Sequence, residues 1–205
     1  MTGLRVEALG EIPFDEAEIL RYALLPKAAP RPEELPLASC LAAAKGAACC
    51  MAVWQRFPLR FLDSGLDLGF ARTASKDLGG WLEGCGEVLL FACTAGAEMD
   101  RRIQREGLRS PVRELLMNAI GAQQVEGACD RLCLLLEKHF PTHELTPRYS
   151  PGYGDLPLSL QREVFAALDC ERRLGVTLTE SLLMRPSKTV TAIVGMKKKA
   201  REGGK

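Results

Sequence analysis

The stretch EVLLFAC, residues 87–93, is a continuous apolar run that lies between Gly86 and Gly96. Such a run is typical of a strand buried on both faces of a sheet. The segment that follows, AEMDRRIQREG (97–107), has the composition of a helix. A buried strand followed by a helix predicts a sheet covered by helices, and the rest of the chain is interpreted around this centre.

The longest predicted element is a helix over residues 110–140. It begins at Ser110-Pro111, where Ser110 is a favourable N-cap and Pro111 suits the first helical position. Glu114 follows in the first turn, and apolar residues recur at helical spacing through the whole segment. We therefore expect one long helix packed along the sheet.

The remaining elements alternate irregularly between helices and strands. Helices are expected at 15–25, 37–53, 73–84 and 160–174, the last capped by Ser159. Strands are expected in a hairpin of 53–62 and 66–70 around Asp63-Ser64-Gly65, and at 177–184 and 189–196 around the turn 185–188. Hairpins and crossovers together predict an α+β fold, with helices packed around a curved mixed or antiparallel sheet.

Chain length and composition favour a single domain. We expect this domain to cover residues 1–196, with the proline-rich segment 26–36 as an internal connector. The last residues, KKKAREGGK (197–205), carry no apolar partners and predict a disordered basic tail.

The overall charge and hydropathy exclude several classes of partner. Net charge is +1, from 27 basic and 26 acidic residues, so no nucleic-acid footprint is expected. No apolar run approaches the ~20 residues that a membrane-spanning helix needs, which favours a cytoplasmic protein. The eight cysteines show no C-x-x-C spacing and no matching histidine, so we expect buried thiols in a reducing compartment and no metal site.

No arrangement of side chains predicts acid–base or nucleophilic catalysis. The only histidines, His139 and His143, lie near a predicted helix end, where the helix dipole explains them. G-x-S-x-G, P-loop and G-x-G-x-x-G patterns are missing from the sequence. We therefore predict no catalytic residue.

The stretch RYSPGYGDLP, residues 148–157, is the most distinctive loop of the chain. Gly152 allows a ligand to approach the backbone closely, and Tyr153 offers an aromatic face with a hydroxyl group. Arg148 could pair with a carboxylate. A small-molecule site and a rigid turn between two helices are both consistent with these residues.

Two motifs in this region resemble a known family. The pattern Arg148-x-Ser-Pro-Gly-Tyr153 is similar to the S-adenosylmethionine-binding signature of the activation domain of vitamin B12-dependent methionine synthase. Downstream, Leu178-Thr-Glu-Ser181, Met184, Pro186 and Val190 are similar to a second stretch of that family. The two motifs occur in the family's order, and together they cover about residues 148–195.

The resemblance implies both a ligand and a partner. Domains of this family hold S-adenosylmethionine over a cobalamin whose cobalt has been oxidised, so that reduction and methyl transfer restore the active cofactor. The ligand would be bound by Arg148, Ser150, Pro151, Gly152 and Tyr153, and Glu126 would meet its positive end. Glu126 could equally be a core-facing acid with a polar partner. The cobalamin would be carried by a corrinoid-bearing methionine synthase, with a flavodoxin-like or other electron donor.

The resemblance is incomplete, and this leaves more than one function open. The sequence runs only a little past Gly195, where the family domain continues, and an acidic residue near the family's N-terminus has no clear counterpart. We expect a short free-standing accessory protein, a component of the methyltransferase system rather than an autonomous enzyme.

The main alternative is a docking module that has lost S-adenosylmethionine binding. An independent methyltransferase would need a base or metal that the sequence does not provide. A groove between the 148–155 loop and the helix of Glu126 would favour the first function, and an exposed apolar patch without a groove would favour the second.

Overall fold

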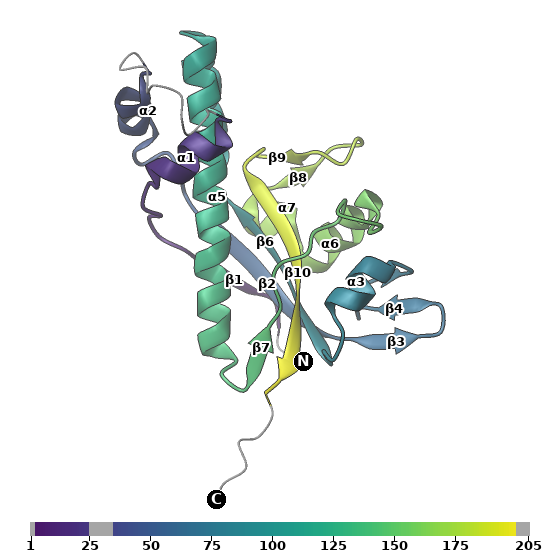
Figure 1. The fold of residues 1–205 in the computed structure, drawn as a ribbon. Helices are drawn as coiled ribbons and strands as arrows, with labels where there is room; N and C mark the ends of the chain where they lie inside the picture. The colour runs from purple at the N-terminus through teal and green to yellow at the C-terminus, as the bar shows by residue number, and fades with distance from the viewer. Residues whose placement is uncertain (1–2, 25–34, 200–205) are drawn as a thin grey trace, which may run out of the picture.

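The computed structural model describes residues 3–24 and 35–199 and is built around a five-stranded antiparallel sheet (Figure 1). The strand order is β1 (Arg5–Ala8), β2 (Met51–Pro58), β6 (Glu87–Thr94), β10 (Thr189–Lys198) and β7 (His143–Leu145). Each neighbouring pair in this order is antiparallel. The predicted α+β class is confirmed, and the sheet is antiparallel rather than mixed. β1 was not predicted from the sequence.

Strand β6 lies at the centre of the sheet, as the apolar run predicts. Its residues 88–94 are all buried, and it pairs with β2 on one side and β10 on the other. Alternate side chains point to opposite faces of a strand. Leu89 and Phe91 therefore join one apolar cluster, whereas Val88 and Leu90 join another. The sheet separates two cores.

Four helices share the core on the first face of the sheet. They are α1 (Glu16–Tyr22), α2 (Leu37–Ala44), α4 (Ala97–Gly107) and α5 (Pro111–His139), of which α5 packs on the strands and the other three pack against α5. α5 is the predicted long helix and runs the length of the sheet (Figure 1). The Ser110 hydroxyl accepts a hydrogen bond from the Val112 amide at 3.2 Å, so the predicted N-cap is confirmed.

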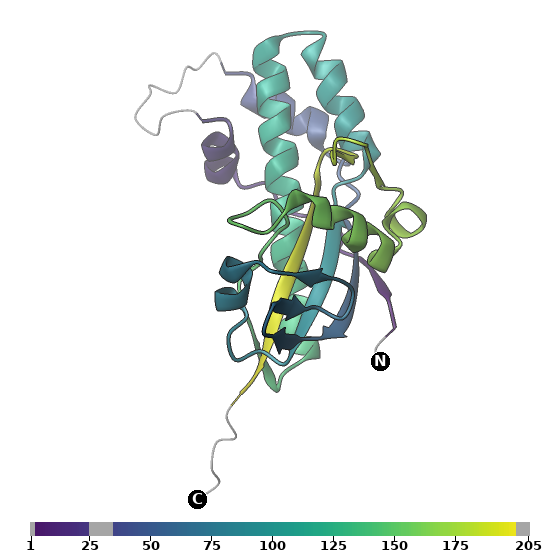
Figure 2. The ribbon, with the colours of Figure 1, turned by 90° about the vertical axis from the view of Figure 1, so that its right-hand side faces the viewer.

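Smaller elements cover the opposite face (Figure 2). They are a three-stranded sheet of β3 (Arg60–Leu62), β4 (Gly65–Asp67) and β5 (Arg72–Thr73), and the helices α3 (Lys76–Trp81), α6 (Gln161–Leu168) and α7 (Cys170–Leu174). A short ladder of β8 (Thr177–Leu178) and β9 (Met184–Arg185) follows α7 in the chain. The hairpin predicted around residues 63–65 is present as β3 and β4.

The helix predicted over 37–53 is too long. α2 ends at Ala44, and Gly46 then adopts a φ of +70°, which glycine tolerates best. Residues 51–53 belong to β2, which pairs with β1 and β6 instead of forming the first half of the hairpin. Alanine-rich sequence favours a helix locally, but pairing with the central strand decides the structure of these residues.

The strand predicted over 177–184 is also wrong. Its ends form the β8–β9 ladder, and between them the chain turns back on itself. The Thr179 hydroxyl accepts a hydrogen bond from the Leu183 amide at 3.0 Å, and Leu182 adopts a φ of +64°. A side-chain hydroxyl that captures a backbone amide competes with strand pairing. β10 therefore pairs with β6 and not with this segment.

The helix predicted over 160–174 is interrupted once. Asp169 adopts the left-handed conformation, with φ +51° and ψ +45°, and separates α6 from α7. Its carboxylate lies 2.5 Å from Arg172 Nε, an ion pair beside the break. Ser159 does not cap this helix, because it lies inside a short 3-10 turn, Leu158–Leu160, that precedes α6.

The ends of the described segments refine two further expectations. β10 extends to Lys198, because Lys197 and Lys198 pair with β7 across the predicted start of the basic tail. Residues 200–205 of that tail, and most of the connector predicted at 26–36, lie outside the described residues. Within 3–24 and 35–199, we find no helix long and apolar enough to cross a bilayer.

The cysteines behave mainly as buried apolar side chains. Six are buried, Cys133 is half-buried, and only Cys49 is exposed. Burial raises the pKa of Cys50 to about 11 and that of Cys170 to about 12. These thiols therefore stay protonated at neutral pH, which is the behaviour of structural rather than reactive cysteines.

Candidate functional site

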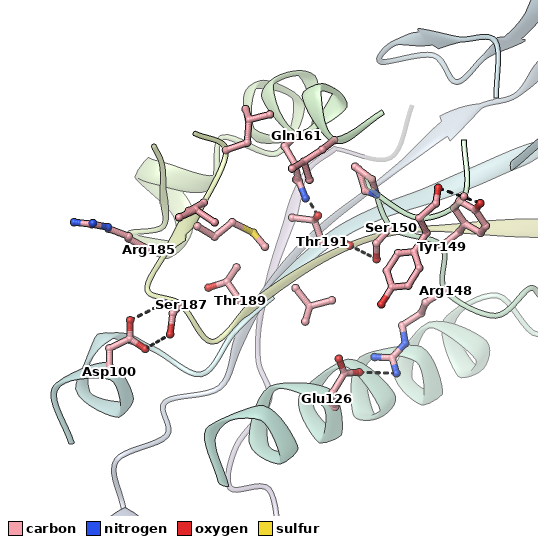
Figure 3. A pocket seen from close by; sticks show the side chains of 18 of the residues that line it. Asp100, Glu126, Arg148, Tyr149, Ser150, Gln161, Arg185, Ser187, Thr189 and Thr191 are labelled. Atoms are coloured by element: carbon pink, nitrogen blue, oxygen red, sulfur yellow. Dashed lines mark hydrogen bonds and ion pairs between the residues drawn. The ribbon is translucent and has the colours of Figure 1, made fainter. Parts of the chain in front are cut away.

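A groove of about 1220 Å³ crosses the edge of the sheet at β10, between α5 on one face and α6 on the other (Figure 3). This edge is open because β7 pairs with only the last residues of β10, from Met196 onward. The loop that contains the RYSPGYGDLP stretch closes one side of the groove. The groove thus lies between the 148–155 loop and the helix that carries Glu126.

The loop first follows β10 and then leaves it. Tyr149 and Ile193 exchange backbone hydrogen bonds at 2.9 and 2.8 Å, as neighbouring strands do. At the next residue the pattern changes, and the Ser150 hydroxyl donates to the Thr191 carbonyl at 2.7 Å. Pro151 follows and has no amide N–H with which to continue the pairing. The chain therefore departs from the sheet at this point and opens the groove.

Asp155 anchors the far end of the loop to the start of α3. Its carboxylate accepts hydrogen bonds from the Ser75 hydroxyl and from the Lys76 amide, the latter at 2.7 Å. In return, the Asp155 amide donates to the Asp77 carboxylate at 3.1 Å. The hydrogen bonds from Ser75 and from the Lys76 amide lower the pKa of Asp155.

This anchor predicts a pH-dependent contribution to stability. A carboxyl group whose pKa is lower in the folded chain stabilises the fold above its unfolded pKa of about 3.9, and loses that effect as pH falls through the folded pKa. Asp155→Ala is therefore expected to lower the urea midpoint at pH 7, and the difference from wild type should shrink as pH falls below about 4. Asp63→Ala, at an exposed carboxylate in the β3–β4 turn, is the matched control. A difference that stays constant from pH 7 to pH 3 would contradict this role of the carboxylate.

One end of the groove is charged. Arg148 Nη2 lies 3.0 Å from Glu126 Oε2 and 2.9 Å from Asp130 Oδ1, so the loop and α5 are joined by ion pairs. Burial acts to lower the pKa of Arg148, but Cys129 and these two carboxylates outweigh it and raise the pKa. Arg148 Nη1 is buried and has no hydrogen-bond partner among the described residues. A buried guanidinium donor without an acceptor is costly, and a ligand carboxylate would satisfy it.

The predicted ligand residues are placed together, with one exception. Glu126, Arg148, Ser150, Pro151 and Tyr153 all line the groove. Gly152 does not, because its amide donates to the Leu156 carbonyl at 2.9 Å inside the turn. Its φ of +95° explains why glycine occupies this position. The loop is thus a rigid turn and also one wall of a groove.

Several groove residues carry no recognisable signal in the sequence. Asp100 of α4 accepts hydrogen bonds from the Ser187 amide at 2.6 Å and from its hydroxyl at 2.9 Å. Gln161 and Thr191 meet across the groove floor, where the Thr191 hydroxyl donates to Gln161 Oε1 at 2.9 Å (Figure 3). Each of these contacts joins segments at least 30 residues apart, which no local pattern reveals.

Apolar side chains form the rim of the groove. Leu182 and Leu183 come from the turn between β8 and β9, Met184 is the first residue of β9, and Leu158 comes from the 3-10 turn before α6. Leu183 is 63% exposed and Tyr153 is 67% exposed. The groove therefore combines the Arg148–Glu126 end, further charged groups at Asp100 and Arg185, a neutral polar floor and an apolar rim. Polar groups within a largely apolar lining are common in small-molecule sites.

Comparison with known proteins agrees with this architecture. Residues 135–202 match the family model described as vitamin B12 dependent methionine synthase, activation domain. The fold is similar to that of a crystal structure of the MetH reactivation domain bound to AdoHcy, with a TM-score of 0.65 and 16% identity, over 97% of this chain and 80% of that chain. A search of curated proteins gives no match. The predicted resemblance is thereby confirmed: the chain has the fold of the methionine synthase reactivation domain, and its residues 135–202 carry the sequence pattern of the activation-domain family.

Proposed function

We propose that this protein is an accessory component for the reductive reactivation of a cobalamin-dependent methionine synthase, and that its groove binds S-adenosylmethionine as the methyl donor. The cobalamin is carried by a corrinoid-bearing partner, and the electrons come from a separate flavodoxin-like or other donor. In this proposal the protein is a free-standing subunit that acts in the cytoplasm. The free thiols of all eight cysteines are consistent with a reducing compartment.

The charged end of the groove carries the proposal. An amino acid presents a carboxylate and an ammonium group side by side. Arg148 Nη1 is a buried donor without a partner, suited to the carboxylate, and Glu126 lies 3.0 Å from the same guanidinium, suited to the ammonium. The methionine part of the ligand would therefore replace part of the Arg148–Glu126 ion pair with matched contacts of its own.

The role of the chain is to bind and orient the ligand. When bound, S-adenosylmethionine supplies a methyl group that its sulfonium already activates, so no side chain needs to act as a base. Arg148 and Glu126 hold the amino-acid end. Glu126 is positioned by α5, and Arg148 by the 148–155 loop, which Ser150 and Asp155 join to β10 and to the start of α3. Tyr153 and Leu183 on the exposed rim limit the access of water to the bound ligand.

The groove also bears on the alternative function. A docking module without a ligand predicts no concave site at the 148–155 loop. A groove of about 1220 Å³ at that place, with a donor left without an acceptor, supports ligand binding instead.

Titration calorimetry with S-adenosylmethionine and S-adenosylhomocysteine tests the proposal. We expect saturable binding to the wild-type protein, weakened about 10- to 100-fold in Arg148→Ala, which corresponds to the roughly 1.5–3 kcal/mol of hydrogen bonds to a charged group. Arg105→Ala is the matched control, because Arg105 is exposed on α4 and does not line the groove. It should bind as wild type does. Lack of heat and of thermal stabilisation at millimolar ligand would reject ligand binding.

A further inference from the structure

The floor of the groove is made by two polar residues that are almost fully buried. Gln161 is 3% exposed and Thr191 is 2% exposed, yet both line the groove. Gln161 is the first residue of α6, and Thr191 lies in β10 where the 148–155 loop leaves the strand. A buried carboxamide requires hydrogen-bond partners, because its burial without them costs free energy.

A short relay of hydrogen bonds fixes the orientation of this carboxamide. The Ser150 hydroxyl donates to the Thr191 carbonyl at 2.7 Å, and the Thr191 hydroxyl donates to Gln161 Oε1 at 2.9 Å. The oxygen of the carboxamide is therefore occupied. Its Nε2 carries two N–H groups, and none of the described residues accepts a hydrogen bond from them. The Gln161 amide nitrogen is thus a positioned donor that the protein leaves for another molecule.

The chemistry around this donor differs from that at the charged end. Leu158 of the preceding 3-10 turn and Leu182 line the same groove and are apolar, and Thr191 is neutral. A neutral donor above an apolar wall suits a flat heteroaromatic ring with nitrogen or oxygen acceptors, whereas an ionic group is better satisfied by Arg148 and Glu126. The two ends of the groove therefore select different parts of one ligand.

We propose that Gln161, oriented by Thr191, hydrogen-bonds the purine ring of the ligand and so defines the nucleoside end of the groove. This inference rests on the proposed function, because it assigns the orientation of a ligand that contains both an amino acid and a nucleoside. The amino acid lies at Arg148 and Glu126, and the nucleoside lies over Gln161 and Thr191. Gln161 is the residue that contacts the ligand, and Thr191 is a positioning residue.

A crossed experiment with the two halves of the ligand tests this orientation. Adenosine and methionine are used separately as competitors of S-adenosylhomocysteine, with wild type, Gln161→Leu and Arg148→Ala. We expect Gln161→Leu to weaken the binding of adenosine about tenfold and to leave the binding of methionine unchanged. Arg148→Ala should weaken the binding of methionine and leave that of adenosine unchanged. Glu163→Leu is the matched control, because Glu163 is exposed on the same helix, α6, and does not line the groove. It should change neither competitor.

Two further variants separate recognition from folding. Gln161→Glu keeps the size of the side chain and an oxygen for the Thr191 hydroxyl but removes the N–H donor. It should therefore weaken the binding of adenosine as much as Gln161→Leu does. Thr191→Val keeps the Gln161 donor but removes the hydroxyl that orients the carboxamide. It should therefore weaken the binding of adenosine by a smaller factor, about threefold, without affecting the binding of methionine. Circular dichroism is the check that each variant is folded.

The outcomes distinguish this inference from the proposed function. If wild type binds S-adenosylhomocysteine but Gln161→Leu and Gln161→Glu bind adenosine as wild type does, the orientation is overturned and the proposed function stands. Equal weakening of adenosine and methionine by the Gln161 variants would also overturn it. If wild type binds no S-adenosylhomocysteine, both the proposed function and the orientation fail.

Discussion

Replacement of Phe91 by alanine is expected to lower the free energy of unfolding by about 3–5 kcal/mol, which is the range for removal of a fully buried phenylalanine. Phe91 lies in the middle of β6, is 0% exposed, and pairs with Trp54 of β2 and Ala192 of β10. Its side chain belongs to the core beneath α5. Loss of the ring leaves a cavity that rigid neighbours on three strands and a helix cannot fill.

Urea denaturation followed by circular dichroism measures this effect, since the midpoint and slope give the free energy of unfolding. Phe61→Ala is the matched control, because Phe61 lies in β3 of the small sheet and is 52% exposed. It should cost less than about 1 kcal/mol. Equal losses in the two variants would show that β6 is not the centre of the cooperative core.

The elements that the sequence predicts well are those whose signal is local. The apolar run at 87–93 needs no partner to be recognised as a buried strand, and Ser110-Pro111 marks the start of α5 through its own hydrogen bond and ring geometry. Hydrophobic periodicity then extends α5 over almost its full length. These two elements define the α+β class and the position of the larger core.

The errors arise where distant pairing outweighs local preference. Residues 51–53 follow an alanine-rich helix but join β2, because β6 and β1 offer backbone partners on both sides. Residues 177–184 contain strand-forming residues, but the Thr179 hydroxyl captures the Leu183 amide and turns the chain back. The helix break at Asp169, between α6 and α7, is not marked by a glycine or a proline at that position. In each case, the deciding contact is not visible in the local sequence.

The candidate site divides in the same way. Six ligand residues were predicted through their resemblance to a family motif, and all but Gly152 line one groove. They are Glu126, Arg148, Ser150, Pro151, Gly152 and Tyr153. Asp100, Gln161 and Thr191 were missed, since they reach the groove from α4, α6 and β10 and carry no motif of their own. Gly152 was expected to face a ligand, but its amide closes the turn that shapes the loop.

The rigidity of that loop leads to the second large effect. Gly154 adopts a φ of +51° and lines the groove, and a Cβ at this position would lie 2.6 Å from the Tyr149 hydroxyl and closer still to the Asp77 carboxylate. Neither group can move freely, because Asp77 accepts from the Asp155 amide at 3.1 Å and Tyr149 packs against Trp81 with ring centroids 5.5 Å apart. Gly154→Ala is therefore expected to cost about 3 kcal/mol of stability, through left-handed backbone strain and overpacking together.

Gly175→Ala separates these two causes. Gly175 adopts a similar φ of +65°, but a Cβ there meets nothing within 4 Å, so only the backbone strain of about 1 kcal/mol remains. The difference in the free energy of unfolding between the two variants, measured by urea denaturation, then gives the cost of displacing Asp77 and Tyr149 from the loop.

The same displacement moves Ser150 and Arg148 relative to α5. Gly154→Ala should therefore also weaken the binding of S-adenosylhomocysteine by more than about tenfold, whereas Gly175→Ala should bind this ligand as wild type does. Equal stability losses in the two variants would mean that the contacts of Asp77 and Tyr149 with the loop give way easily. The groove would then be shaped by the ligand rather than by the fold.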